Sequence, residues 1–385
     1  MRLGDLYAGG VRRDTDARHR VRGPARVDQH RDRPSHRGDG YGRPGFTRGP
    51  GTPRGGRQAG HRSPPPHPRQ PRGRHDHGPA AGPRPRRAAG GRDGMSTRDR
   101  EQYLLSDADS RRIFDERIVP TEFAGVAGVD HPVVHFFGGQ PGAGKSVVQA
   151  SVMSAIIAAE DIGAEGIGAV AAIIGDDFRP HHPAFHRLLT IDDEAAAFYT
   201  DLDSGRWVEQ AIAWAVRMRP HVILEGTFRR PELTVETARR FTAAGFAAHL
   251  HVQAVHHFIS RTRIFGRYHD QLRSNGQGRY TLPAAHDASY GTLPASVAEI
   301  VRSGVFAGAT AYSVTGQVVA EAADRDLSGI VDAVANAQQS TPSPEETGDL
   351  LGLLDRFEAT FLRCDKTAIV ADLRVLRSEM FDARA

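Results

Sequence analysis

Short apolar runs alternate with longer segments of helical spacing along the middle of the chain. Each apolar run ends in turn-forming residues, so we expect buried strands at 133–139, 169–177, 221–227 and 247–255. The segments between them predict helices at 145–159, 192–218 with a break near Ser204–Gly205, and 231–244. Strands that alternate with helices predict an α/β fold in which helices flank a mainly parallel sheet.

Helical spacing also occurs on both sides of this region. Residues 106–123 predict a helix capped by Ser106 or Asp107 and ended by Pro120. A helix at 296–303 is expected to precede a further strand at 311–316.

The C-terminal part of the sequence divides into a polar and an apolar stretch. Residues 335–349 are polar and contain two prolines, which is typical of a linker. Leucine and phenylalanine then recur at helical spacing over 350–385. We therefore expect a folded domain at 95–334, followed by one or two helices that pack on the domain or on a partner.

The first 94 residues differ in composition from the rest of the 385-residue chain. They hold 22 Arg and eight Asp without Lys or Glu, a net charge of +14, whereas residues 95–385 carry a net charge of −10. The segment is dense in Gly, Pro, His and Arg and has no apolar periodicity. We therefore expect residues 1–94 to form a disordered tail.

Three interpretations of this tail remain open. An Arg/Gly-rich tail can bind nucleic acid, but only Tyr41 and Phe46 place aromatic rings in its middle, which argues against that partner. Pro and Gly argue against the amphipathic helix of a mitochondrial presequence. The third interpretation is a start-site extension, because the sequence from Met95 resembles the natural beginning of a globular protein.

The compartment is predicted from two features. The sequence shows neither the apolar stretch of a secretory signal nor about 20 consecutive apolar residues for a membrane span. Its one cysteine, Cys364, precludes an intramolecular disulfide, which fits a reducing environment. We therefore expect a cytoplasmic protein with no membrane partner.

The strongest chemical signal is GQPGAGKS, which lies between a predicted strand and a predicted helix and satisfies the P-loop pattern GxxxxGK[ST]. In such a loop, backbone N–H groups and the helix N-terminus bind polyphosphate. Lys145, one of only two lysines in the chain, would reach the β- and γ-phosphates, and Ser146 would ligate Mg²⁺. The predicted ATP-binding residues are Gly139, Gln140, Pro141, Gly142, Ala143, Gly144, Lys145 and Ser146.

Carboxylates follow two of the other predicted strands. Asp176 and Asp177 would lie at the sheet edge where ligands bind, and a carboxylate there can accept a proton from a substrate hydroxyl. A helix cap or a place near Mg²⁺ is the alternative role. Glu225 and Thr227 share the same edge, where Glu225 would support Mg²⁺ or orient a substrate hydroxyl.

The remaining polar residues favour a transferase. Glu225 has no acidic neighbour of the kind found in motor ATPases, and the base-reading NKxD motif of GTPases is absent. Arginines in 261–271 and 276–287 would border the phosphates, where they can stabilise charge on a transferring phosphoryl group. His181 and His182 have no further ligands at metal spacing, so we expect no zinc site.

The order of these motifs resembles the zeta toxin family of P-loop kinases over residues 132–315. The resemblance rests on GQPGAGKS, DDFRPHHPAF, SGRWVEQA, LEGT, the Arg267–Tyr268 pair and GRYTLPAAHD. It implies a P-loop NTPase-type fold and a kinase that phosphorylates UDP-N-acetylglucosamine at the 3′-hydroxyl of its sugar. It also implies a small helical antitoxin as a possible partner, whereas the C-terminal extension beyond residue 335 is longer than in compact family members.

Roles for single residues follow from the resemblance alone. It makes Asp176 the general base and places Asp177 where the family has Ser or Thr. Arg267 and Arg279 match two arginines near the γ-phosphate. Glu209 matches a position that contacts the sugar nucleotide. Thr227 matches a substrate-side position, and His182–Pro183 matches the HP of the second motif.

The sequence thus predicts an ATP- and Mg²⁺-dependent kinase. Catalysis is assigned to Asp176, Lys145, Arg267 and Arg279, and substrate binding to Glu209, Glu225 and Thr227. One alternative is a P-loop kinase for another metabolite or for an antibiotic hydroxyl. A second alternative is an RNA-binding protein in which the P-loop serves as a nucleotide switch and the Arg-rich tail binds RNA.

Overall fold

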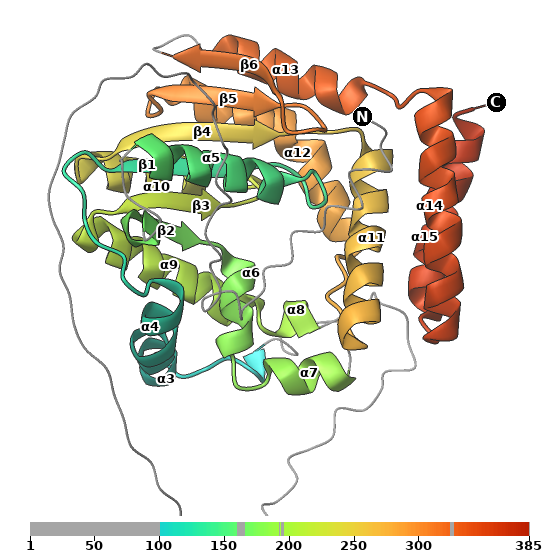
Figure 1. Cartoon of the computed structure of the whole chain (residues 1–385), viewed down its shortest axis with the longest axis horizontal. Helices are drawn as coiled ribbons and strands as arrows, with labels where there is room; N and C mark the ends of the chain where they lie inside the picture. Colours follow the sequence, from blue (N-terminus) through green and yellow to red (C-terminus); the bar gives the residue numbers. More distant parts are fainter. Residues whose placement is uncertain (1–100, 160–165, 192, 194–195, 324–326, 385) are drawn as a thin grey trace, which may run out of the picture. The chain divides into compact units, whose positions relative to one another are not determined.

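The computed structural model describes residues 101–384 apart from 160–165, 192, 194–195 and 324–326 (Figure 1). The tail predicted at 1–94 lies outside the described residues. Six strands form one sheet in the order β2-β3-β1-β4-β5-β6, and all neighbours are parallel except β5 and β6. The strands are β1 (Val133–Gly138), β2 (Val170–Ile173), β3 (His221–Glu225), β4 (Ala247–Gln253), β5 (Gly308–Tyr312) and β6 (Val318–Ala323).

Helices cover both faces of this sheet, as predicted (Figure 1). One face buries the main core, to which Trp207, Phe241 and Val297 contribute from three of the helices. The other face buries Phe137 under Val148. The covering helices are α5 (Lys145–Ala159), α9 (Asp201–Met218), α10 (Pro231–Ala243), α12 (Pro283–Arg302) and α13 (Ser328–Gln339).

A chain of hydrogen-bonded polar rings lies on the same sheet face as Phe137. The His135 Nδ1 atom is 2.9 Å from His251 Nε2, and His251 Nδ1 is 2.8 Å from the Tyr312 hydroxyl. Burial lowers the pKa of His135 and of His251 to about 3, and neighbouring histidines add to the effect. Both imidazoles are therefore neutral at physiological pH.

The predicted N-terminal helix forms but passes through Pro120. It consists of α3 (Asp107–Ile113), a π-helical turn (Phe114–Ile118) and α4 (Val119–Glu122), and the Ser106 hydroxyl caps its start. Pro120 lies in the first turn of α4, where the missing N–H is tolerated, so the helix continues past the proline. It ends at residue 122.

The segment with the two aspartates differs from the prediction. Strand β2 ends at Ile173, and Asp176 and Asp177 lie on the short helix α6 (Gly175–Phe178) instead of on a strand. After α7 (Phe185–Ile191), the predicted break at Ser204–Gly205 is also wrong. Helix α9 is continuous there, and Thr200 separates it from α8 (Ala196–Tyr199).

Two predicted elements near the end of the sheet are too short or shifted. The helix expected at 296–303 is the end of α12, which begins at Pro283 and contains Pro294. The strand expected at 311–316 ends at Tyr312, because Ser313–Gly316 form the turn to β6. Strand β6 was not predicted, and its side chains are mainly exposed although five of its six residues are apolar.

The C-terminal helices pack on α11 (His257–Asn275) (Figure 1). They are α14 (Pro344–Arg363) and α15 (Thr367–Asp382), and their leucines and phenylalanines form a second core with α11. The linker predicted at 335–349 is wrong for most of its length, because only residues 340–343 lie between α13 and α14. Pro344 at the helix start and a capping box of Ser343 with Glu346 begin α14 there.

No helix in the described part of the chain is both long enough and apolar enough to cross a membrane.

Candidate active site

A cavity of about 560 Å³ opens where β1, β2 and β3 end at the same edge of the sheet. Ligands bind at this edge in open α/β sheets. Six cationic and three anionic side chains line the cavity, so it carries net positive charge. The cationic residues are Lys145, Arg179, Arg229, Arg263, Arg267 and Arg279, and the anionic residues are Asp176, Asp201 and Glu225.

The loop between β1 and α5 forms one wall of this cavity. Two of its glycines have positive φ angles, which side-chain-bearing residues rarely adopt: φ is 145° at Gly139 and 79° at Gly142. A Cβ on Gly142 would lie 2.1 Å from the Ser260 carbonyl oxygen, so α11 approaches the loop too closely for any side chain. The loop thus has the tight cradle that the sequence predicts for phosphate, and α5 begins directly after it.

Lys145 is buried at the start of α5. Its amine donates to the carbonyl oxygens of Gly139 at 3.0 Å and Gln140 at 3.3 Å. The Glu225 carboxylate is 3.8 Å from this amine and accepts a hydrogen bond from Gln149 at 2.7 Å. Burial lowers the pKa of Lys145, and the charge of Glu225 opposes that shift.

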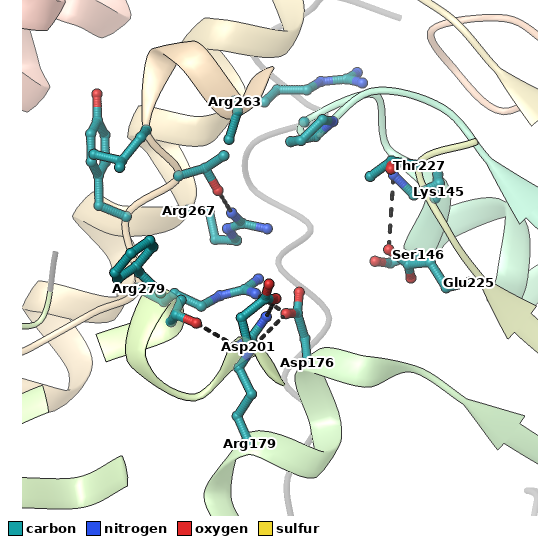
Figure 2. Close-up of a pocket in the computed structure, with 18 of the residues that line it drawn as sticks. Lys145, Ser146, Asp176, Arg179, Asp201, Glu225, Thr227, Arg263, Arg267 and Arg279 are labelled. Carbon is teal, nitrogen blue, oxygen red and sulfur yellow. Dashed lines mark hydrogen bonds and ion pairs between the residues drawn. The ribbon is translucent and has the colours of Figure 1, made fainter. Parts of the chain in front are cut away.

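Asp176 faces the cavity from α6, opposite the lysine (Figure 2). Its carboxylate is ion-paired with Arg279 and accepts from Arg179 Nε at 3.0 Å. Burial by itself would raise the pKa of Asp176, but the two guanidinium groups outweigh it and hold the pKa well below the usual range. Asp176 is therefore an ionised carboxylate between two cations.

Arg179 and Asp201 are site residues that the sequence analysis missed. The Arg179 guanidinium bonds to the Asp201 carboxylate at 3.0 Å, the Thr200 hydroxyl at 3.2 Å and the Ala197 carbonyl at 2.6 Å. A possible signal was the spacing of Arg179, three residues after Asp176 and therefore one helical turn away. These contacts hold the floor of the cavity in one arrangement.

Helix α11 presents two arginines to the cavity from the side that faces the P-loop (Figure 2). Their spacing of four residues places both on one helix face. Arg263 is one of the arginines in 261–271 that were expected to border the phosphates, and it donates to the carbonyls of Ala143 at 2.8 Å and Val314 at 3.0 Å. Arg267 donates to the Thr281 hydroxyl at 2.7 Å, and burial, helped by the charge of Arg279, lowers its pKa to about 10.

Most of the predicted site residues meet at this cavity. Lining residues predicted from sequence are Pro141, Gly142, Gly144, Lys145, Ser146, Asp176, Glu225, Thr227, Arg267 and Arg279. Gln140 and Ala143 support the loop from behind, where Gln140 donates to the Val255 carbonyl at 2.6 Å. Within the described residues, no group of three or more His, Cys, Asp or Glu side chains could hold a metal.

Glu209 is the predicted substrate-binding residue that the structure does not bring to the cavity. Its side chain is 60 % exposed and forms an ion pair with Arg240 of α10 at 2.7 Å, away from the cavity. Asp201 faces the cavity from the same helix, and eight residues of helix place Glu209 about 12 Å further along the axis. His182, the other motif residue of uncertain role, is buried against the Asp203 carboxylate at 3.3 Å and is structural.

Comparison with known proteins gives one family and several relatives. The family model described as "Zeta toxin" matches residues 121–326. "Toxin zeta" of Enterococcus hirae is 25% identical over 190 residues, which cover 49% of this chain and 63% of that protein. "Toxin PezT" of Streptococcus pneumoniae serotype 4 is 26% identical over 157 residues, or 40% of this chain and 58% of that protein. The chain thus spans less than two thirds of these curated relatives.

A solved structure shares the fold. A chain from the PezAT chromosomal toxin–antitoxin system of Streptococcus pneumoniae aligns with a TM-score of 0.54 and 18% sequence identity. The alignment covers 69% of this chain and 98% of that chain. At this identity the likeness concerns the arrangement of sheet and helices, and it agrees with the fold class expected from sequence.

Proposed function

Because the chain belongs to the zeta toxin family, we propose that it is a kinase that transfers the γ-phosphate of ATP to a hydroxyl group of a small acceptor. The observation that carries the proposal is the placement of an ionised carboxylate, Asp176, across one cavity from the P-loop lysine, Lys145. Phosphoryl transfer requires positioning and charge stabilisation more than covalent chemistry by the protein. A cationic cavity with one opposed carboxylate meets both needs.

ATP would bind with its phosphates on the P-loop. Backbone N–H groups and the N-terminus of α5 would contact the β-phosphate, and Lys145 would exchange its loop carbonyls for phosphate oxygens. Arg267 and Arg279 would face the γ-phosphate from the opposite wall.

Mg²⁺ fits the oxygen donors of this cavity. The Ser146 hydroxyl would be its protein ligand, and the Glu225 carboxylate lies near enough to support its waters. The scarcity of clustered carboxylates among the described residues suits an ion that takes most of its ligands from phosphates and water. When bound, Mg²⁺ neutralises charge on the phosphate oxygens.

The acceptor hydroxyl would lie between Asp176 and the γ-phosphorus. A new O–P bond forms to the acceptor oxygen, the bond from phosphorus to the ADP oxygen breaks, and Asp176 takes the hydroxyl proton. The low basicity of Asp176 is compatible with this role, because a loose transition state leaves the proton in place until late. Arg279, now paired with Asp176, would turn to the transferring phosphoryl group and thereby release the carboxylate.

The acceptor that we propose is the 3′-hydroxyl of the sugar in UDP-N-acetylglucosamine, as the resemblance of the motifs implies. The excess of cations around the cavity supports an acceptor that brings its own diphosphate beside ATP. We place the activity in the cytoplasm and propose a small helical antitoxin as its partner. The PezAT structure comes from a toxin–antitoxin system.

The test is an acceptor panel. Purified protein is incubated with ATP, Mg²⁺ and either nucleotide sugars, other hydroxyl metabolites or hydroxyl-bearing antibiotics, and products are identified by mass spectrometry. We expect one added phosphoryl group on UDP-N-acetylglucosamine and none with Lys145→Ala. Phosphorylation of a different acceptor would keep the kinase and overturn the nucleotide sugar. Failure on every acceptor, with ATP bound, would contradict the kinase.

A further inference from the structure

The C-terminal helices α14 and α15 lie beyond the matched region 121–326, yet Asp372 of α15 contacts the segment that carries Arg279. Lys366 stands between the two helices, and its amine is 2.5 Å from the Asp193 carboxylate. Asp193 in turn accepts from the backbone N–H of Gly278 at 3.2 Å. We propose that Lys366 and Asp193 are positioning residues that fix Arg279 in the active site, an inference that rests on the proposed function.

We call Lys366 and Asp193 together the clamp, and Asp193 is the residue of the pair that contacts the segment before Arg279. Only 4% of the residue is exposed, so its carboxylate must be paired inside the protein. One oxygen accepts from the Lys366 amine, and the other accepts from the Tyr268 hydroxyl at 2.8 Å and from Gly278. Loss of Lys366 would leave the buried charge of Asp193 uncompensated. We expect this to weaken the hydrogen bond that Asp193 accepts from the Gly278 N–H.

The backbone on both sides of Arg279 has further anchors. The Arg279 N–H donates to the Gln271 side chain at 2.7 Å, and the Tyr280 hydroxyl donates to Asp372 of α15 at 3.1 Å. A Cβ on Gly278 would lie 2.8 Å from Gln271 Cβ and 2.9 Å from the Tyr268 ring, so the segment sits directly on α11. Helix α15 thus contacts the residue after the arginine through Asp372, and Lys366, between the two helices, reaches the residue before it through Asp193.

The consequence for catalysis concerns geometry. Arg279 is ion-paired with Asp176 and faces the place where charge develops on the phosphoryl group. A displacement of about 1 Å can cost on the order of 10²-fold in rate when it misplaces a group that acts in the transition state. ATP binding depends mainly on the P-loop, which the clamp does not contact. The clamp should therefore affect kcat much more than KM for ATP.

The primary test is Lys366→Met, which keeps the length of the side chain and removes its charge. We expect kcat to fall roughly 10- to 100-fold with little change in KM. The matched control is Arg377→Gln. Arg377 pairs with Asp355 at 3.1 Å and Glu358 at 2.7 Å, both in α14. The substitution therefore removes ion pairs of the C-terminal helices that do not involve the segment carrying Arg279. An equal loss of kcat in both variants would overturn the proposal.

A double-mutant cycle tests whether Lys366 acts through Arg279. In an Arg279→Gln background, Lys366→Met should lower kcat only slightly further, because the group being positioned is already gone. Losses that multiply in full would show independent action and overturn the proposal. Should Lys366→Met fail to fold, Asp372→Ala decides the question, since it releases Tyr280 without leaving a buried charge, and the same fall in kcat is expected.

Hydrogen exchange separates this proposal from the proposed function. The amides of 276–282 should exchange faster in Lys366→Met than in the unchanged protein or in Arg377→Gln, whether or not kinase activity is found. Unchanged protection of 276–282 would overturn the clamp. Faster exchange without any kinase activity in the unchanged protein would leave the clamp in place and overturn the function.

Discussion

Asp176→Asn removes the proposed proton acceptor and preserves the shape of the side chain. Arg179 retains its contacts to Asp201, Thr200 and Ala197, so the floor of the cavity should keep its structure. We expect turnover to fall by about 10²- to 10⁴-fold, the usual scale for a general base. Thermal melting of both proteins checks that the loss is not due to unfolding.

The direction in which Asp176→Asn changes ATP affinity distinguishes a general base from a metal ligand. Asp176→Asn removes one of three anions from a cavity with six cations, so it should leave ATP binding unchanged or strengthen it. If the Asp176 carboxylate and a phosphate charge of ATP are on the order of 8 Å apart in a water-like medium, loss of their repulsion favours binding by roughly 0.5 kcal/mol, or about twofold in affinity. If the variant instead weakens ATP binding at fixed Mg²⁺ and keeps its turnover, Asp176 supports the metal, and the assignment of the base is refuted.

Asp177→Asn is the matched control, because it removes the same charge one residue further along α6. Adjacent residues of a helix point about 100° apart, and Asp177 does not line the cavity. We expect a loss of at most several-fold, measured in the same assays. A larger loss for Asp177→Asn than for Asp176→Asn would mean that the roles of the two aspartates are exchanged.

Three further outcomes are expected. Lys145→Ala should nearly abolish turnover, because its amine would act on the phosphates, with little change in melting temperature, because it lies at the start of α5 and belongs to no hydrophobic core cluster. Retained turnover, or a loss that parallels unfolding, would count against its role. Glu209→Ala should leave kcat and KM unchanged, because Glu209 pairs with Arg240 outside the cavity, and steady-state kinetics would detect any contribution. Burial lowers the pKa of His135 and His251 to about 3, so the unfolded chain binds their protons first and stability should fall as pH drops below about 6.5. Below about pH 6.5, each histidine should lower the free energy of unfolding by roughly 1.4 kcal/mol per pH unit. The measurement is urea unfolding near pH 7 and near pH 5, and equal stability at the two pH values would contradict this prediction.

The elements that the sequence predicts well are those whose signal is local. The apolar runs that became β1, β3 and β4 are buried on both faces of the sheet and need no long-range information to identify. Strand β6 pairs only with β5 at the edge of the sheet and is mainly exposed, so its apolar run VVAEAA does not mark a buried strand as the others do. The supposed linker contains Ser343 and Glu346, whose capping box is a helix signal that a count of polar residues and prolines overlooks.

The site shows the same division. The P-loop is continuous in sequence, and its residues were predicted together. Arg179 lies one helical turn from Asp176 but reaches Asp201 across 22 residues of sequence, and Lys366 reaches Asp193 across 173, so neither of these two distant contacts has a sequence pattern. Glu209 was assigned from its match to a family motif alone, and the structure places its side chain outside the cavity, where it pairs with Arg240.

The most direct test of the kinase follows the γ-phosphate itself. Purified protein is given ATP radiolabelled at the γ-position, Mg²⁺ and UDP-N-acetylglucosamine, and the label is traced after separation of the products. We predict that label moves into the nucleotide sugar, and that Lys145→Ala and Asp176→Asn nearly abolish the transfer. Label that appears only as inorganic phosphate, at the same rate with and without acceptor, would indicate a nucleotide switch and contradict the proposed kinase activity.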